Sequence, residues 1–346
     1  MNTNEEITPH SIEKLEVYEK YLKAYLPVMI RAPFEPIMVI DPFAGKGTDE
    51  NGHDGSAVRA QKVLNSLEGA GKVHLIFNDS NPEYYQSLRK CLGTKDVRIK
   101  ITNWDANVII NKCLDIPYKS AHRLFFIDPF GYTQLTPSTW QKLFLMKNTE
   151  ILIFIPTYHV YRFLHAGEYQ ERLRPIAQFL STFGIDSKTA RYINDHDEFL
   201  TSIQNGLKDT AGTQFVYKKS IKHENCNSRY CLFFITKHIY GADRFLEALR
   251  GIDKNNPDLF YNTVDDRDTT LINAILAKKK WNNKEVYEEG IKLGFPVSKI
   301  VYVLGQLENE GKIAVNSLQK RRGTNYYIKH KYLKEEPRLE FITQTR

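Results

Sequence analysis

Four aspartates stand where apolar, strand-like segments of the sequence end: Asp41, Asp79, Asp105 and Asp128. Ligands of open α/β sheets bind at the carboxyl ends of the strands, so these carboxylates are expected to gather at one edge of a sheet. A carboxylate after the second strand accepts hydrogen bonds from both hydroxyls of a ribose, so Asp79 favours a cofactor that contains adenosine. Asp79 and Asp105 are also placed to cap the helices that follow them.

A glycine turn follows the first of these strands. Residues 37–47 read Ile-Met-Val-Ile-Asp-Pro-Phe-Ala-Gly-Lys-Gly, and the apolar start predicts a buried strand. Glycine has no side chain to obstruct a ligand, so Gly45 and Gly47 let the backbone approach one closely. The third glycine of the dinucleotide fingerprint is absent, and Lys46-Gly47-Thr48 does not match a P-loop. Dehydrogenase and nucleotide-hydrolase interpretations are therefore disfavoured.

Strand-like segments alternate with helix-length segments over most of the chain. This alternation predicts βαβ units and a parallel sheet. An amphipathic helix over residues 11–30 is expected to come first, and an antiparallel pair at 214–221 and 230–236 is expected at the sheet edge. The parallel strands are expected at 37–41, 73–77, 97–101, 124–127 and 151–155.

The last part of the chain has a different pattern. Three expected helices, at 271–280, 285–293 and 298–309, precede two short expected strands at 313–315 and 326–328. This is the order of a winged helix-turn-helix. Residues 274–334 contain 13 lysines and arginines against five glutamates, and that excess is larger than the +7 net charge of the whole chain. A local basic face suits phosphate, so DNA or RNA is the expected partner. The candidate contacts are Lys299, Tyr302, Lys320, Arg321 and Arg322.

Composition is that of a soluble globular protein, with 42% hydrophobic and 26% charged residues. Four cysteines without a paired C-x-x-C favour a reducing cytoplasm. No apolar run reaches membrane-spanning length, and Cys226 and Cys231 with His223 and His238 have only marginal spacing for zinc, so neither membrane nor metal is expected. The predicted domains are an N-terminal helical extension (1–36), a Rossmann-like domain (37–265), a winged helix (266–334) and a tail (335–346).

The segment Asp-Pro-Phe-Ala-Gly-Lys-Gly at 41–47 resembles the first cofactor motif of class I S-adenosylmethionine-dependent methyltransferases. The resemblance implies a Rossmann-like methyltransferase sheet and S-adenosylmethionine as cofactor. It places the Gly45 turn beside the methionine part of the cofactor and Asp79 at its ribose, and Trp104-Asp105 resembles a later motif that contacts the adenine. The cofactor contacts so implied are Asp41, Pro42, Phe43, Gly45, Gly47, Asp79, Ser80 and Asp105.

Asp128-Pro129-Phe130-Gly131 lies where amino-methyltransferases carry Asp/Asn-Pro-Pro-aromatic. In those enzymes the acid and the next backbone carbonyl hold the target amino group, and the aromatic ring stacks on a flipped base. The resemblance implies this role for Asp128, Pro129 and Phe130, although Gly131 stands in place of the aromatic. Three hypotheses stay open: a nucleic-acid methyltransferase, a catalytically inactive binding or partner subunit, and a small-molecule or protein methyltransferase whose winged helix forms a dimer contact.

A second resemblance is more extensive. The N-terminal helix, the motif at 41–47, the Gly55-Ser56 pair with Arg59-Ala60, and the Phe-Ile-Asp-Pro-Phe-Gly segment resemble the three-Cys-motif partner protein family over residues 11–240. Members are methyltransferase-like and are encoded beside a protein with a triple-cysteine motif, and some carry a C-terminal winged helix. The resemblance therefore implies such a protein as a partner.

Overall fold

The computed structural model describes residues 9–93, 95–116, 121–129, 131–165, 170–222, 229–253, 264–318 and 326–344. The chain divides into two compact units, Met1–Lys237 and His238–Arg346. The sequence placed its boundary near residue 265, whereas this division falls before the helix α10 (Ile239–Asp253). No low-complexity linker marks either position, so composition gave no signal for the division.

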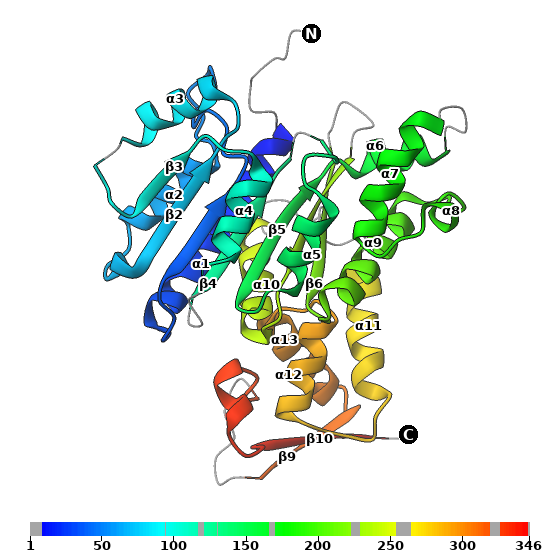
Figure 1. Ribbon diagram of the computed structural model, residues 1–346. Helices are drawn as coiled ribbons and strands as arrows, with labels where there is room; N and C mark the ends of the chain where they lie inside the picture. Colours follow the sequence, from blue (N-terminus) through cyan, green and yellow to red (C-terminus); the bar gives the residue numbers. More distant parts are fainter. Residues whose placement is uncertain are drawn as a thin grey trace. The chain divides into compact units, whose positions relative to one another are not determined.

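The first unit is built on a seven-stranded sheet with the order β3-β2-β1-β4-β5-β7-β6 (Figure 1). The first five strands are parallel, and β7 runs antiparallel to both β5 and β6. This is the expected Rossmann-like methyltransferase arrangement, and the predicted antiparallel pair is confirmed. The strands are β1 (Ile37–Asp41), β2 (Val73–Asn78), β3 (Ile99–Thr102), β4 (His122–Ile127), β5 (Thr149–Ile155), β6 (Val216–Lys222) and β7 (Arg229–Ile235).

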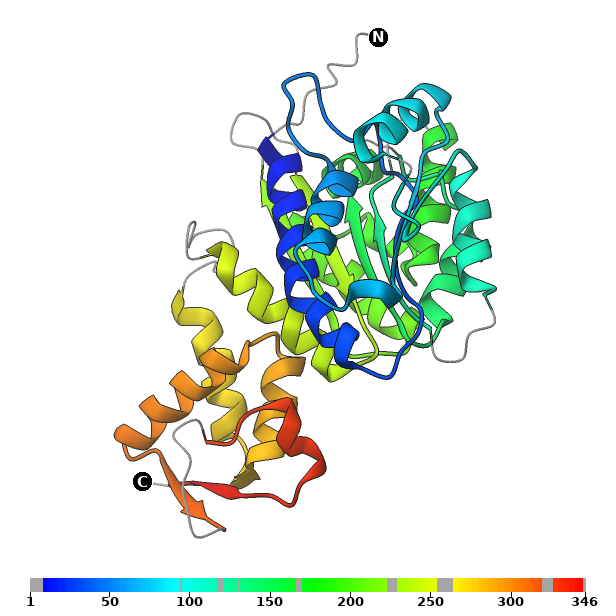
Figure 2. The same cartoon turned by 90° about the vertical axis from the view of Figure 1, so that its left-hand side faces the viewer.

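Helices cover both faces of this sheet, as Figure 2 shows. The blue α1 and α2 lie on one face, and α4 and α5 lie on the other. The helices of this unit are α1 (Pro9–Arg31), α2 (Ser56–Asn65), the 3-10 turn η1 (Ala70–Lys72), α3 (Pro82–Leu92), α4 (Ala106–Leu114), α5 (Pro137–Leu145), α6 (Thr157–His165), α7 (Gln170–Thr182), α8 (Ser187–Ala190) and α9 (His196–Ala211).

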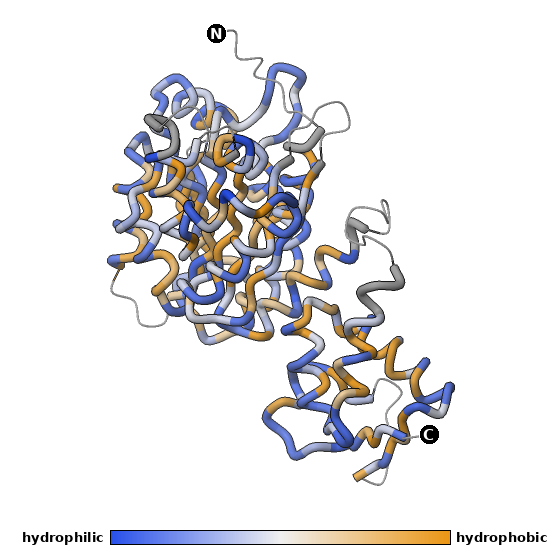
Figure 3. The backbone as a smooth tube through the Cα atoms, turned by 90° about the vertical axis from the view of Figure 1, so that its right-hand side faces the viewer, coloured by the Kyte–Doolittle hydropathy of each residue, from blue (hydrophilic) through white to orange (hydrophobic). Residues whose placement is uncertain are grey.

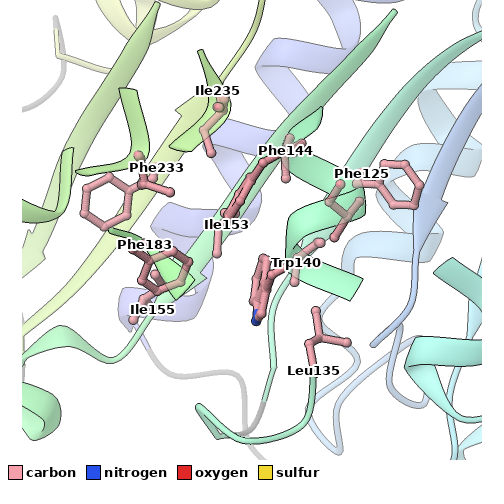
Figure 4. Packing of buried hydrophobic residues seen from close by; sticks show 14 of the residues in the cluster. Phe125, Leu135, Trp140, Phe144, Ile153, Ile155, Phe183, Phe233 and Ile235 are labelled. Atoms are coloured by element: carbon pink, nitrogen blue, oxygen red, sulfur yellow. The ribbon is translucent and has the colours of Figure 1, made fainter. Parts of the chain in front are cut away.

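The alternating direction of side chains along each strand explains why helices cover both faces of the sheet. Successive side chains of a strand point to opposite faces, and every residue of β4 is buried. Phe125 joins the cluster of apolar side chains around Trp140 and Phe183, which is shown in Figure 4. Phe126 instead stacks on Tyr18 of α1, with ring centroids 4.3 Å apart. The continuous apolar runs of the sequence therefore correspond to strands with two buried faces.

The second unit combines helices with a small antiparallel sheet of order β8-β10-β9. Besides α10, its elements are α11 (Val264–Leu276), β8 (Lys280–Asn282), α12 (Asn283–Lys292), α13 (Val297–Asn309), β9 (Ile313–Ser317), the 3-10 turn η3 (His330–Lys334) and β10 (Leu339–Thr343). Apolar stretches, orange in Figure 3, recur along the helices of this unit. Gly290 of α12 permits close packing on α13, because a Cβ there would lie 2.3 Å from Ile300.

The strand predicted at 326–328 is wrong. Tyr326 and Tyr327 have φ values of 48° and 53°, in the left-handed region, so this segment turns instead of extending. The strand that pairs with β9 is β10, which lies in the segment predicted to be a tail. The three helices predicted for this region are confirmed as α11, α12 and α13, and β8 was not predicted.

Candidate functional site

The edge of the sheet at the ends of β1, β2 and β3 is organised by Asn78, a fully buried residue. Its amide nitrogen donates to the carbonyl oxygens of Pro42 (3.1 Å) and Trp104 (2.9 Å). Its amide oxygen accepts from the Thr102 hydroxyl (2.8 Å) and from the Trp104 backbone N–H (2.9 Å). One side chain therefore ties the loops after β1 and β3 to the end of β2. Asn78 was not predicted, because its only signal in the sequence is a polar residue at the end of an apolar strand.

Gly45 and Asp79 are brought together as predicted. The Gly45 backbone N–H donates to Oδ2 of Asp79 (3.0 Å), and the Asn81 N–H donates to its Oδ1 (2.8 Å). Gly45 has a φ of +65°, which favours glycine, and no described atom beyond its chain neighbours lies within 4 Å of the position a Cβ would take. The turn therefore presents backbone to open space beside a carboxylate. Burial raises the pKa of Asp79 above its ordinary value, although both backbone N–H groups oppose this shift.

Gly47 has a different role. Its φ of +94° also favours glycine, but a Cβ there would lie 3.1 Å from Cys91, the exposed cysteine of α3. The Gly47 carbonyl oxygen accepts from the Gly55 N–H at 2.7 Å and closes the polar loop before α2. Gly47 therefore shapes the loop against α3, whereas Gly45 faces open space.

Asp41 lies inside the protein and anchors the first loop. It is fully buried and accepts hydrogen bonds from the Phe43 N–H (3.0 Å) and the Ser56 hydroxyl (2.6 Å). The pKa of Asp41 is raised to about 7, mainly by burial and also by the nearby carboxylates of Asp128 and Asp79, although the two hydrogen bonds oppose this shift. Asp41 holds the turn in shape, with Phe43 partly buried against the core.

Asp128 is paired with a lysine from α1. The ammonium group of Lys14 bonds Oδ2 of Asp128 and lies 4.5 Å from the centroid of the Phe154 ring. The Lys14 side chain is 8% exposed and that of Asp128 25%. Phe130, the predicted stacking residue, lies outside the described residues. Among the described residues, apart from its chain neighbours, Gly131 has no atom within 4 Å of the position a Cβ would take.

Tyr18 follows Lys14 by about one turn of α1. Its hydroxyl is buried and has no hydrogen-bond partner among the described residues. Burial raises the pKa of Tyr18 well above its ordinary value, and the charge of Asp41 adds to the effect. Lys14, Tyr18, Tyr21 and Tyr25 recur at helical spacing, and all four are buried. That spacing was the available signal that Lys14 belongs to the buried face of α1.

The predicted adenine contacts lie at the start of α4. Asp105 is exposed and caps α4 by accepting from the Asn107 N–H at 2.8 Å. The Trp104 ring is 38% exposed, with the Lys112 ammonium 5.0 Å from its centroid. Ser80 is also exposed, directly after Asp79. These residues border the same edge as the Gly45 turn, because Asn78 binds the Trp104 backbone.

No group of three or more His, Cys, Asp or Glu residues suited to a metal ion occurs in the described part of the chain. His223 and Cys226 of the marginal zinc pattern lie outside it, and Cys231 is fully buried in β7. The helices described here include none long and apolar enough to cross a membrane.

In the second unit, α13 buries one face and exposes another. Ile300, Val303, Leu304 and Leu307 are buried. On the other face the Lys299 ammonium lies 5.1 Å from the centroid of the Tyr302 ring, and the Gln306 amide donates to the Tyr302 hydroxyl at 2.7 Å. Tyr302 is 54% exposed. Lys320, Arg321 and Arg322 lie outside the described residues.

No protein-family model matches the sequence, and no curated protein matches it. Among solved structures, protein LPL1258 from Legionella pneumophila aligns at 12% identity and a TM-score of 0.41, covering 69% of this chain and 91% of its own. A SAM-dependent methyltransferase from Agrobacterium tumefaciens aligns at 9% identity and a TM-score of 0.36, covering 67% and 63%. The fibrillarin pre-rRNA processing protein of Methanococcus jannaschii aligns at 12% identity and a TM-score of 0.30, covering 60% and 69%. Likenesses this distant carry no argument about ligand or reaction.

Proposed function

We propose that the first unit binds S-adenosylmethionine at the edge formed by the Gly45 turn and Asp79, and that the protein is a methyltransferase. The observation that carries this proposal is the hydrogen bond from the Gly45 N–H to Asp79, beside open space at the Gly45 Cβ position. It joins the turn after the first strand to the acid after the second, which is where an α/β sheet binds an adenosine-containing ligand.

The donors and acceptors at this edge fit an adenosyl group. A carboxylate offers about four lone pairs, and the two backbone N–H groups use two of those on Asp79, so two remain for the ribose hydroxyls. Exposed Trp104 and Asp105 border the edge and are the proposed adenine contacts. The bound cofactor would supply a methyl group on a positively charged sulfonium, and the Asp79 carboxylate suits a cation nearby.

We further propose that the acceptor is a nucleic acid held by the second unit, acting as a winged helix. The proposal is supported by the order of its elements and by the exposed Tyr302 of α13, which the half-buried Lys299 and Gln306 contact. The basic residues Lys320, Arg321 and Arg322, which lie outside the described residues, are further proposed contacts on the basis of the sequence. Phosphate binding releases counterions, so the affinity for DNA or RNA should fall steeply as salt rises. An affinity independent of salt would contradict this part of the proposal.

Calorimetric titration with S-adenosylmethionine and S-adenosylhomocysteine tests the cofactor proposal. Asp79→Asn should weaken binding by about 10-fold or more, because a charged acceptor of the ribose hydroxyls is lost. Asp186→Asn is the matched control, because Asp186 caps α8 at an exposed position and asparagine caps equally well. Absence of binding by either ligand to the wild-type chain would refute the proposal.

A second candidate is a catalytically inactive methyltransferase-like subunit that binds nucleic acid or a protein with a triple-cysteine motif. The Lys14–Asp128 ion pair favours it, because it engages the carboxylate expected to hold an acceptor amino group. Transfer of a labelled methyl group to mixed DNA and RNA separates the two candidates. Transfer that is lost in Asp128→Asn supports the enzyme. Nucleic-acid binding without transfer, in wild type and in Lys14→Met, supports the inactive subunit.

A further inference from the structure

The second unit contains a cavity of about 660 Å³ that the proposed methyltransferase function does not use. Its volume lies within the roughly 300–1,000 Å³ of small-molecule sites. It is formed by α10, the first turns of α13 and the start of η3. The residues that line it are Tyr240, Asp243, Arg244, Glu247, Val297, Ser298, Val301, Lys329, His330 and Lys331.

Three polar groups of this lining have no hydrogen-bond partner among the described residues: Oδ1 of Asp243, Nε of Arg244 and Oγ of Ser298. Asp243 is 2% exposed. Its other carboxylate oxygen accepts from the Tyr287 hydroxyl (3.3 Å) and from the Arg244 guanidinium (3.2 Å). Unpaired buried polar groups are costly and rare, so three around one cavity indicate that a ligand completes them. The Asp243 oxygen is a hydrogen-bond acceptor for such a ligand, and the Arg244 N–H and the Ser298 hydroxyl are donors.

One wall of the cavity is aromatic. The rings of Tyr240 and His330 stack with centroids 4.4 Å apart and planes 14° apart, and the Arg244 guanidinium lies 5.2 Å from the centroid of Tyr240. Burial, and then the neighbouring His238, lower the pKa of His330 below the usual histidine value. A neutral ring at pH 7 suits contact with a flat heterocycle.

Charge is divided across the cavity. Lys329 and Lys331 are exposed, and no ion pair joins either of them to a carboxylate in the described parts of the chain. Asp243 and Glu247 supply the negative side, and Glu247 already accepts from the Ser298 backbone N–H at 3.4 Å. A ligand with N–H donors at one end and an anionic group at the other matches this division.

We propose that this cavity binds a nucleotide. The base lies against the Tyr240–His330 wall, with its donor and acceptor edge toward Asp243 and Arg244, and the phosphate lies toward Lys329 and Lys331. Guanine suits the edge best, because it presents N–H donors next to a carbonyl acceptor. A free nucleotide and a single nucleotide of a bound strand share this chemistry. The inference does not depend on cofactor binding by the first unit.

Titration of the full chain with GMP, AMP, ribose 5-phosphate, inorganic phosphate and a guanine-containing tetranucleotide tests the proposal. GMP should bind more tightly than AMP, and both more tightly than the two probes without a base. Arg244→Met and Ser298→Ala should each weaken GMP binding, by about 10- to 100-fold for the charged Arg244 donor. Lys292→Met, an equal loss of charge at an exposed position of α12 outside the cavity lining, should leave the affinity unchanged.

Thermal unfolding of each variant establishes that it is folded. If Arg244→Met does not fold, Ser298→Ala still tests the proposal. Binding of the tetranucleotide alone, lost in the same variants, assigns the site to a nucleotide of a strand. Equal binding of ribose 5-phosphate and GMP, binding by both variants at wild-type affinity, or no binding of any probe at millimolar concentration would overturn the proposal. A parallel titration with S-adenosylmethionine reports on the first unit separately.

Discussion

Asn78→Asp should destabilise the first unit through one buried atom. The substitution replaces the amide NH₂ by a carboxylate oxygen of nearly the same size. That oxygen faces the carbonyl oxygens of Pro42 and Trp104. In the wild type these two oxygens accept hydrogen bonds of 3.1 and 2.9 Å from the Asn78 amide. Two hydrogen bonds are lost at about 1 kcal/mol each, and three oxygens are left facing one another in a buried site. We expect the free energy of unfolding to fall by about 3 kcal/mol at pH 7.

The pH dependence of this loss identifies its cause. Burial beside two carbonyls should raise the pKa of the new carboxyl above its unfolded value of about 3.9. The folded variant then holds its proton to a higher pH than the unfolded one, so its deficit relative to wild type should narrow as the pH falls from 8 to 5. The protonated carboxyl regains one donor, which restores about 1 kcal/mol.

Urea denaturation followed by tryptophan fluorescence measures the effect, with Trp281→Phe in all variants so that only Trp104 and Trp140 of the first unit report. Asn65→Asp is the control, because it makes the same chemical change at an exposed position near the end of α2. It should change stability by about 0.5 kcal/mol or less. If Asn78→Asp loses no more stability than Asn65→Asp, or if its loss of stability does not vary with pH, the assigned hydrogen bonds are refuted.

Three further predictions follow from other contacts. The folded pKa of Asp41, about 7, exceeds its unfolded value, so this residue lowers stability progressively as the pH rises from about 4 to 7. The free energy of unfolding, measured against pH, should fall less steeply over this range in Asp41→Asn, and an unchanged slope would contradict the raised pKa of Asp41. Gly206→Ala should lower the free energy of unfolding by about 3 kcal/mol or more, because its Cβ would lie 2.0 Å from the Phe183 carbonyl oxygen. Gly71→Ala, whose Cβ meets open space, should be nearly neutral in thermal unfolding, and equal effects of the two substitutions would count against the packing at Gly206. Lys14→Met should cost about 2 kcal/mol by leaving Asp128 without its partner, and adding Asp128→Asn should recover much of the loss; a double-mutant cycle with no coupling would exclude the ion pair.

The sequence alone determined the features that depend on neighbouring residues. Uninterrupted apolar runs required strands buried on both faces, and β4 is such a strand. The Gly45 turn and Asp79 were predicted to meet because parallel strands end at a common edge, and their hydrogen bond follows from that geometry. Three helices were predicted between residues 271 and 309, and α11, α12 and α13 confirm them.

Tertiary structure decided which distant residues become partners. Lys14 and Asp128 are 114 positions apart in the sequence, and neither residue type predicts that the other will be its partner. The strand that pairs with β9 could not be predicted, because two positive φ values turn the chain at Tyr326 and Tyr327 and the later strand β10 pairs with β9 instead. The cavity beside Asp243 has the same origin, because its lining comes from α10, α13 and η3. Local pattern fixes the conformation and burial of a segment, whereas a site depends on which segments the folded chain brings into contact.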